Sequence, residues 1–283
     1  MNVVQEPFLL PTRNGDLFCI YRRPASGVVS AQILHLPAFG DEMNKSRAMT
    51  ARAARAFAAL GCGVLQVDLR GCGDSAGEHS EATCQGWVDD LHHAVAWLKS
   101  RHVGRGMPWL WSLRFGSLLV AALLERGHGQ VPLLLWQPMM TGKQQLNQLL
   151  RQKVASTVGQ RDATRVQELR ERFQRGETLE IGGYSISPAL AGELEAVSFA
   201  LPDGYRGAVC WLEVAATTAL STVAQEHVES LRSARIVVDA FAVRGPGFWQ
   251  SVEIERCDEL VQASASWVEN GLTRGISREP ALL

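Results

Sequence analysis

The chain has 283 residues, 46% of them hydrophobic, and a formal net charge of -1 at pH 7. It can bury one sizeable core, and its balanced charge argues against a protein organised around nucleic acid or an anionic membrane surface. We predict a cytoplasmic protein without a transmembrane segment, because no basic leader and no apolar run of about 20 residues is evident. Six dispersed cysteines without a Cys-x-x-Cys pair favour reduced thiols, and we predict neither a metal nor a cofactor.

The pattern of apolar runs predicts the elements in chain order. Residues 6–11 and 17–22 form a hairpin around Asn14-Gly15, a pair that accepts the positive φ angles of a tight two-residue turn. Strands follow over residues 31–36, 63–69, 107–111, 131–136, 208–214 and 235–241, with helices over 45–60, 82–99, from about 116, 220–233 and 252–270. Because these strands lack polar alternation, they indicate a doubly wound, mostly parallel α/β sheet covered on both faces.

Residues 141–205 break this alternation with polar, charged helices and the irregular run GGYSISPAL. The segment is too long for a connecting loop between two core strands. We therefore predict a core made of residues 1–140 and 206–283, with residues 141–205 inserted as a helical lid over the carboxyl edge of the sheet.

The run WLWSLRFGSLLVAALLE joins a strand directly to a helix. Residues 112–116 match the small-x-nucleophile-x-Gly pattern of a nucleophile elbow, which predicts the α/β-hydrolase fold. Arg114 stands at the nucleophile position, and flanking Ser112 and Ser117 are expected to be structural. A guanidinium offers donors and no attacking lone pair, so an ordinary Ser-His-Asp mechanism is not expected. Arg114 either binds a carboxylate or phosphate ligand, or it pairs with a neighbouring acid as a structural contact.

The base and the acid of a serine triad are also not evident. The fold places the base after its last core strand, where this chain reads AVRGPGFWQSVE, and the only histidines beyond Gly116 are His128 and His227. We expect His227 to be an exposed helical residue. Glu213, at the end of a strand, is the nearest candidate acid and a candidate partner of Arg114.

Two loops carry further candidates. In HLPAFGDEMNKSR, the backbone N–H groups near Ala38 and Phe39 are expected to face a bound oxyanion or carboxylate, together with that of Phe115. Asp41 and Glu42 are candidates for three roles: to activate water, to cap the next helix or to neutralise Arg114.

The second loop, RGCGDSAG over residues 70–77, is expected to be a structural turn. Its Cys72 is expected to be an inert thiol, because nothing in the sequence places a base beside it.

The segments DEMNKSR, VDLRGCGDSAG, LLLWQPMMTGKQQLNQLLR, GGYSISPAL and GPGFWQSVEIE occur in this order over nearly the whole chain. In these segments the chain resembles the type 2 exosortase A system-associated hydrolases. The resemblance implies the α/β-hydrolase superfamily, a bacterial cytoplasmic setting and a hydrolase label. It also implies a link to loci for exopolysaccharide production and for sorting of proteins with PEP-CTERM tails, without supplying a substrate.

Three functional hypotheses follow. The first is a pseudoenzyme that binds a small anionic or acyl ligand, the lid helping to enclose an apolar tail. Its expected ligand contacts are Arg114, Phe115, Ala38, Phe39, Phe248 and Trp249. The second is an ester or thioester hydrolase, or an acyltransferase, in which an acid such as Asp41 or Glu42 activates water. The third is an accessory module that docks proteins of the exosortase or exopolysaccharide locus.

Overall fold

The computed structural model describes residues 2–101, 106–127, 129–157 and 165–274. Eight strands form one sheet in the order β1-β2-β4-β3-β5-β6-β9-β10. They are β1 (Val3–Leu10), β2 (Leu17–Pro24), β3 (Ala31–Leu36), β4 (Cys62–Val67), β5 (Trp109–Leu113), β6 (Leu133–Trp136), β9 (Val209–Ala215) and β10 (Val238–Arg244). β2 pairs antiparallel with β1 and β4, and every other neighbouring pair is parallel. The predicted doubly wound, mostly parallel sheet is confirmed.

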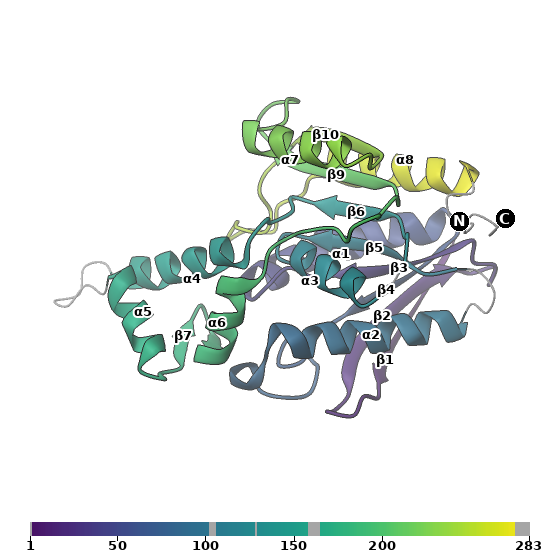
Figure 1. The fold of residues 1–283 in the computed structure, drawn as a ribbon. Helices are drawn as coiled ribbons and strands as arrows, with labels where there is room; N and C mark the ends of the chain where they lie inside the picture. The colour runs from purple at the N-terminus through teal and green to yellow at the C-terminus, as the bar shows by residue number, and fades with distance from the viewer. Residues whose placement is uncertain (1, 102–105, 128, 158–164, 275–283) are drawn as a thin grey trace.

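Helices cover both faces of this sheet (Figure 1). One apolar cluster joins the sheet to α1 (Asp41–Ala59) and α8 (Asp258–Arg274). The other joins it to α2 (Cys84–Arg101), α3 (Gly116–Glu125) and α7 (Thr222–Ser233), and a short 3-10 turn, η1 (His79–Glu81), precedes α2. The central strands β3, β5 and β6 are buried at every position, which accounts for their lack of alternation between apolar and polar residues.

The N-terminal hairpin forms as predicted, but the prediction of a two-residue turn is wrong. Residues 11–16 connect β1 and β2. The Thr12 hydroxyl donates to the carbonyl of Gly15 at 2.6 Å, and the amide of Ala76 donates to Asp16 O at 2.8 Å. The longer loop is therefore stabilised by the side chain of Thr12 and by a contact with Ala76, a distant residue. The Asn14-Gly15 pair alone does not predict either contact.

Several predicted boundaries are also wrong by a few residues. The first helix begins at Asp41 and not at residue 45, so its acidic residues form the first turn. The last strand runs over Val238–Arg244 and not over residues 235–241. The chain turns after α7 at Arg235, which has φ of +63°, and the strand begins only after this turn. The last helix begins at Asp258, six residues later than predicted.

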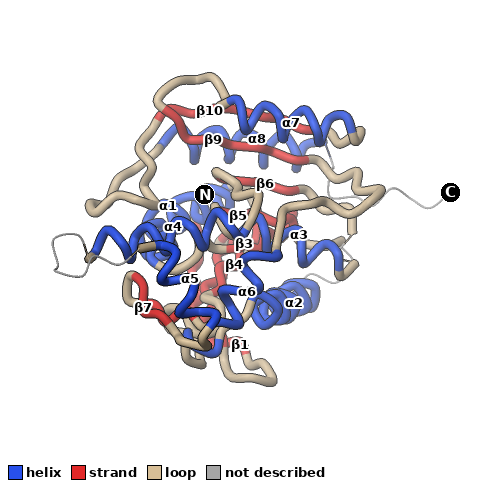
Figure 2. The backbone as a smooth tube through the Cα atoms, turned by 60° about the vertical axis from the view of Figure 1, so that its left-hand side comes forward, coloured by secondary structure: helices blue, strands red, loops and turns tan. Residues whose placement is uncertain are grey.

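A long segment separates β6 from β9. It contains α4 (Gly142–Ser156), α5 (Val166–Gln174), the two-stranded sheet of β7 (Leu179–Ile181) and β8 (Tyr184–Ile186), and α6 (Pro188–Ala196). Figure 2 brings this segment forward and shows α4, α5 and α6 in front of the central strands. Its helices pack on one another through fully buried leucines, namely Leu146, Leu150, Leu169, Leu190 and Leu194.

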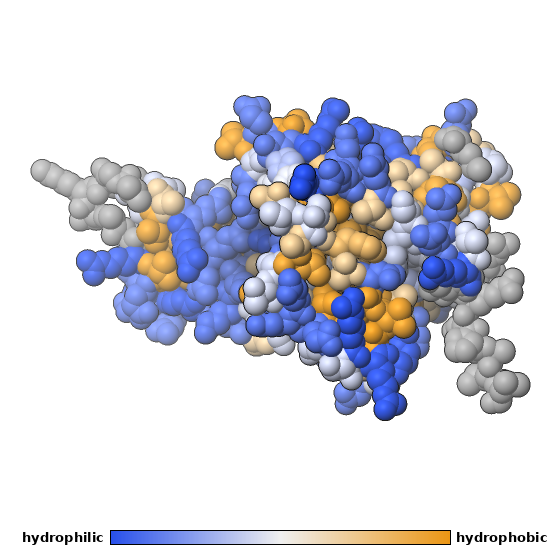
Figure 3. Space-filling view, turned by 90° about the horizontal axis from the view of Figure 1, so that it is seen from above, coloured by the Kyte–Doolittle hydropathy of each residue, from blue (hydrophilic) through white to orange (hydrophobic). Residues whose placement is uncertain are grey.

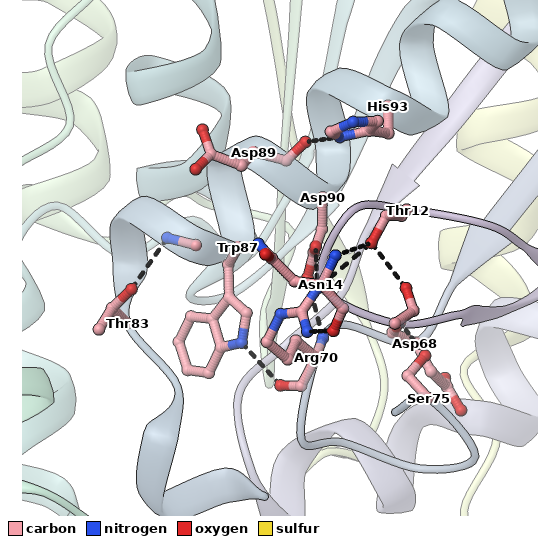
Figure 4. Close-up of polar contacts among 12 residues, drawn as sticks. Thr12, Asn14, Asp68, Arg70, Ser75, Thr83, Trp87, Asp89, Asp90 and His93 are labelled. Atoms are coloured by element: carbon pink, nitrogen blue, oxygen red, sulfur yellow. Dashed lines mark hydrogen bonds and ion pairs between the residues drawn. The ribbon is translucent and has the colours of Figure 1, made fainter. Parts of the chain in front are cut away.

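The 70–77 loop ties β4 to α2 and to the hairpin (Figure 4). The Arg70 amide and guanidinium donate to the carboxylate of buried Asp90 at 3.1 and 3.3 Å, and Trp87 Nε1 donates to Arg70 O at 3.0 Å. Burial raises the pKa of Cys72 to about 12. These contacts support a structural role for the loop and an inert Cys72.

Strand β10 forms one of the two edges of the sheet, and β1 forms the other. Strand β10 leaves Phe241 exposed, as is neighbouring Val237. Figure 3, which views the molecule from above, shows hydrophobic patches interspersed with hydrophilic surface. Within the described residues, no helix is long and apolar enough to cross a bilayer.

Candidate functional site

The turn after β5 has the backbone of a nucleophile elbow. Arg114 follows the strand directly and has φ of +53°, in the left-handed region that side chains other than glycine rarely adopt. A Cβ on Gly116 would lie 2.3 Å from Leu36 O, so only glycine lets α3 approach β3 this closely. The chain therefore forms the strained turn with an arginine at its apex.

The serines beside the elbow lie in structural positions. Ser117 Oγ lies 2.9 Å from Arg114 O and 2.7 Å from Met139 O, and it accepts from Met139 N at 3.0 Å. Ser112 is fully buried, and its Oγ has no hydrogen-bond partner among the described residues.

The Arg114 guanidinium is held by Glu42 from the first turn of α1. Arg114 Nε lies 3.3 Å from both carboxylate oxygens, and Nη2 lies 3.1 Å from Oε1. Gln148 of α4 joins them by accepting from Arg114 Nη2 at 2.9 Å and donating to Glu42 Oε1 at 2.7 Å. With side-chain exposures of 13% for Arg114 and 7% for Glu42, the two charges compensate each other largely away from water.

The other two candidate acids have different partners. Asp41 pairs with Lys45 at 2.8 Å. Glu213 accepts from the backbone amide of Ser221 at 2.7 Å, at the start of α7. Of the acids considered for Arg114, the structure brings Glu42 to it.

A tryptophan follows β10 and lies beside Arg114. The Arg114 guanidinium carbon lies 5.6 Å from the ring centroid of Trp249, within the range of a cation–π contact. Phe248 and Trp249 are both buried, and Phe248 packs edge-on against Trp136. Both belong to the apolar cluster with α1 and α8, and neither lines the cavity beside Arg114.

The three expected oxyanion-hole residues lie together below the elbow. The rings of Phe39 and Phe115 have centroids 5.4 Å apart, and both residues and Ala38 are buried. Within the described part of the chain, none of their N–H groups donates a hydrogen bond. None of the three residues lines the cavity beside Arg114, so the structure does not bring these amides to it.

A cavity of about 530 Å³ opens beside Arg114. Sequence reasoning named Arg114, Glu213 and His227 among its lining residues but missed most of the others. His227 is half-buried and stacks on Trp211 with ring centroids 6.2 Å apart, while His128 lies outside the described residues. The polar lining residues not anticipated are Gln137, Gln144, Asn147, Gln148, Arg151, Ser221 and Gln250.

Hydrogen bonds fix how three of these amides face. Gln137 Oε1 accepts from Val214 N at 2.7 Å, Gln144 Oε1 accepts from the Met140 and Thr141 amides at 3.2 and 3.3 Å, and Asn147 Oδ1 accepts from Arg170 at 2.7 Å.

Every one of these partners is a donor only, so each amide must present its oxygen to the protein. The NH2 groups are left with no partner among the described residues, which makes the cavity rich in hydrogen-bond donors.

Comparisons with known proteins agree with this architecture. A family model for serine aminopeptidases of the S33 type matches residues 40–178, and no curated protein matches the chain. Est1E of Butyrivibrio proteoclasticus, solved with ferulic acid bound, is 12% identical with a TM-score of 0.63 over 96% of this chain and 100% of its own. A lidless α/β serine hydrolase of Xanthomonas campestris is 14% identical, with a TM-score of 0.57 over 98% and 97%.

Mouse α/β hydrolase domain-containing protein 10 is 15% identical to the chain, with a TM-score of 0.58 over 95% of this chain and 99% of its own. The protein has the α/β-hydrolase fold. The family model, which matches about half of the chain, is consistent with this fold. Within that fold, the elbow of this chain carries Arg114.

Proposed function

We propose that this protein binds a small anionic ligand on an α/β-hydrolase scaffold and does not use the serine-hydrolase mechanism. The observation that carries the proposal is the elbow: its apex residue is Arg114, clamped by Glu42 and Gln148. A guanidinium cannot act as a nucleophile, and buried Trp249, which lies beside it, cannot act as a base.

The donor-rich cavity supports a ligand rich in oxygen acceptors. Since Glu42 neutralises Arg114, the cation left to attract an anion is exposed Arg151, which has no ion-pair partner within the described residues. The NH2 groups of Gln137 and Asn147 would donate to the oxygens of the head group. An acyl portion would contact the apolar side of the cavity, which includes Met139, Met140 and Val223.

We further propose the division into a core of residues 1–140 and 206–283 and a lid of residues 141–205. The lid supplies Gln144, Asn147, Gln148 and Arg151 to the cavity, so ligand binding would couple it to the core. On the resemblance to exosortase A-associated hydrolases, we propose a bacterial cytoplasmic role at an exopolysaccharide or PEP-CTERM sorting locus. Proteins of that locus are the proposed partners.

A binding screen tests the proposal. Purified protein is heated with sugar acids, fatty acids, acyl phosphates and acyl-CoA, and a specific ligand raises Tm in a saturable way. Arg151→Gln is expected to weaken the binding of that ligand by about 1.5 to 3 kcal/mol, the range for charge-assisted hydrogen bonds. Arg232→Gln is the matched control, since Arg232 lies on α7 outside the cavity lining. Equal binding by wild type and Arg151→Gln would remove the proposed role of the cavity.

A second candidate is an ester or thioester hydrolase, or an acyltransferase. One observation favours it: Glu213 and His227, an acid and an imidazole, line the same cavity. Glu42 is less suited to activating water, because Arg114 and Gln148 already donate to its carboxylate. This candidate predicts turnover that Glu213→Gln abolishes while Arg151→Gln only raises KM.

A further inference from the structure

A row of polar side chains crosses the sheet beneath α1, away from the cavity at the elbow. Gln5 on β1 is the register partner of Arg22 on β2, and Gln66 on β4 is the register partner of His35 on β3. Arg22 also donates a hydrogen bond to Gln66, which links the two pairs into one row. Four adjacent strands thus each place a polar residue on a face that is elsewhere apolar.

Arg22 is a buried cation without a carboxylate. It is 2% exposed, and it donates to Gln5 Oε1 at 3.0 Å and to Gln66 Oε1, with no ion-pair partner among the described residues. Burial, with Arg55 nearby, lowers its pKa to about 10. A lone buried charge is costly unless a counter-charge compensates it, and two amide oxygens supply only dipoles.

The surroundings of Arg22 do not supply the missing negative charge. Arg47 of α1 already pairs with Asp68 at 2.9 Å, which leaves the Arg22 charge in excess. His35 adds no negative charge, and burial together with the two arginines lowers its pKa to about 3, so it is neutral at pH 7.

These residues enclose a cavity of about 140 Å³ between α1 and the sheet. That volume accommodates several waters or one small polyatomic ion. The buried His35 ring lines the cavity, and its Nε2 has no hydrogen-bond partner in the described part of the chain. Ser46 and Thr50 of α1 also line the cavity, as does Arg47, whose side chain is 42% exposed.

We propose that this cavity binds a small oxyanion of the phosphate or carboxylate class, with Arg22 as its main ligand and His35 and Arg47 as further contacts. The anion supplies the counter-charge that Arg22 lacks. It also joins β2 to α1, the helix whose first turn carries Glu42. The two cavities share no lining residue, although Ala38 and Leu113 beside the elbow line this one, so binding to each can be tested with its own variant.

The test compares Arg22→Met with wild type in buffer without oxyanions and with added inorganic phosphate, selenate or acetate. Wild type is expected to gain Tm saturably with at least one of these ions. Arg22→Met should bind that ion at least about ten-fold more weakly. In oxyanion-free buffer the variant should be as stable as wild type or more so, because it removes an uncompensated buried charge.

Arg23→Met is the matched control. Arg23 is the next residue on the same strand, pairs with Glu6 and lies outside the cavity lining. It should keep the full response to the ion, as should Arg151→Gln, which reports on the other cavity.

Anomalous scattering from selenate soaked into crystals gives a second readout that does not depend on variant stability. The proposal predicts a selenium peak within reach of the Arg22 guanidinium. An empty cavity, or equal responses of wild type and Arg22→Met, would overturn it. A gain in Tm with acetate but not with phosphate or selenate would assign the site to carboxylates. A gain with phosphate or selenate but not with acetate would assign it to tetrahedral oxyanions.

Discussion

Breaking the Arg114–Glu42 pair should destabilise the protein strongly. Removing one partner of a buried ion pair typically costs about 3 to 5 kcal/mol, because the other charge stays buried alone. In Arg114→Met, Glu42 keeps the hydrogen bond from Gln148 at 2.7 Å, which places the expected loss near the lower end, about 3 kcal/mol. Urea unfolding followed by circular dichroism measures this free energy of unfolding.

The double variant Arg114→Met with Glu42→Leu separates pairing from packing. It should be less destabilised than the sum of the single variants by at least about 2 kcal/mol, because neither charge remains. Arg52→Met on the same helix is the control, since its ion pair with Asp258 is half exposed and should contribute less than about 1 kcal/mol. Additive single losses, each below about 1 kcal/mol, would refute the view that this pair compensates two buried charges.

Four other predictions concern the elbow and the buried titratable groups. Arg114→Gly should be more stable than Arg114→Ala by about 1 kcal/mol in urea unfolding, because φ of +53° suits glycine, and equal stabilities would contradict this strain. Gly116→Ala should lower stability by more than about 2 kcal/mol through the clash with Leu36 O, and a wild-type Tm would show that α3 can shift. Burial lowers the pKa of His35, so its contribution to stability is complete above pH 6.5 and is lost as pH falls toward 3. His35→Gln should therefore reduce the slope of the unfolding free energy against pH in that range by up to about 1.4 kcal/mol per pH unit. Parallel profiles of wild type and variant would argue against a neutral buried His35. Because burial raises the pKa of Cys72, native protein at pH 8 should resist alkylation there, as read by peptide mass spectrometry, and rapid labelling would indicate an accessible thiolate.

The local patterns predicted much of the scaffold. Short strands without polar alternation indicated the parallel sheet, and the Ser-Leu-Arg-Phe-Gly run predicted a strand-to-helix turn with Arg114 at its apex; the structure has both. These features depend on residues adjacent in sequence, whose steric and burial requirements are visible in a single segment.

Features that depend on distant segments were not predicted. Glu42 was one of three acids considered for Arg114, and the choice depends on where α1 begins relative to the end of β5. The NH2 groups in the larger cavity face inward because other segments occupy the oxygens of Gln137 and Asn147. The polar row around Arg22 exists only because β2, β4 and β3 are neighbours in the sheet, an order that their sequence order does not reveal.

The most direct test of the proposed function is a turnover measurement on purified wild-type protein. The substrates are short- and medium-chain p-nitrophenyl esters and acyl-CoA thioesters, with Arg114→Ser alongside as a variant that restores a hydroxyl at the elbow. We predict no turnover above buffer for either protein, because Trp249, which follows β10, lies beside residue 114 and cannot act as a base. Saturable turnover by the wild type that is lost in Glu213→Gln would contradict it and establish a hydrolase with a different catalytic arrangement.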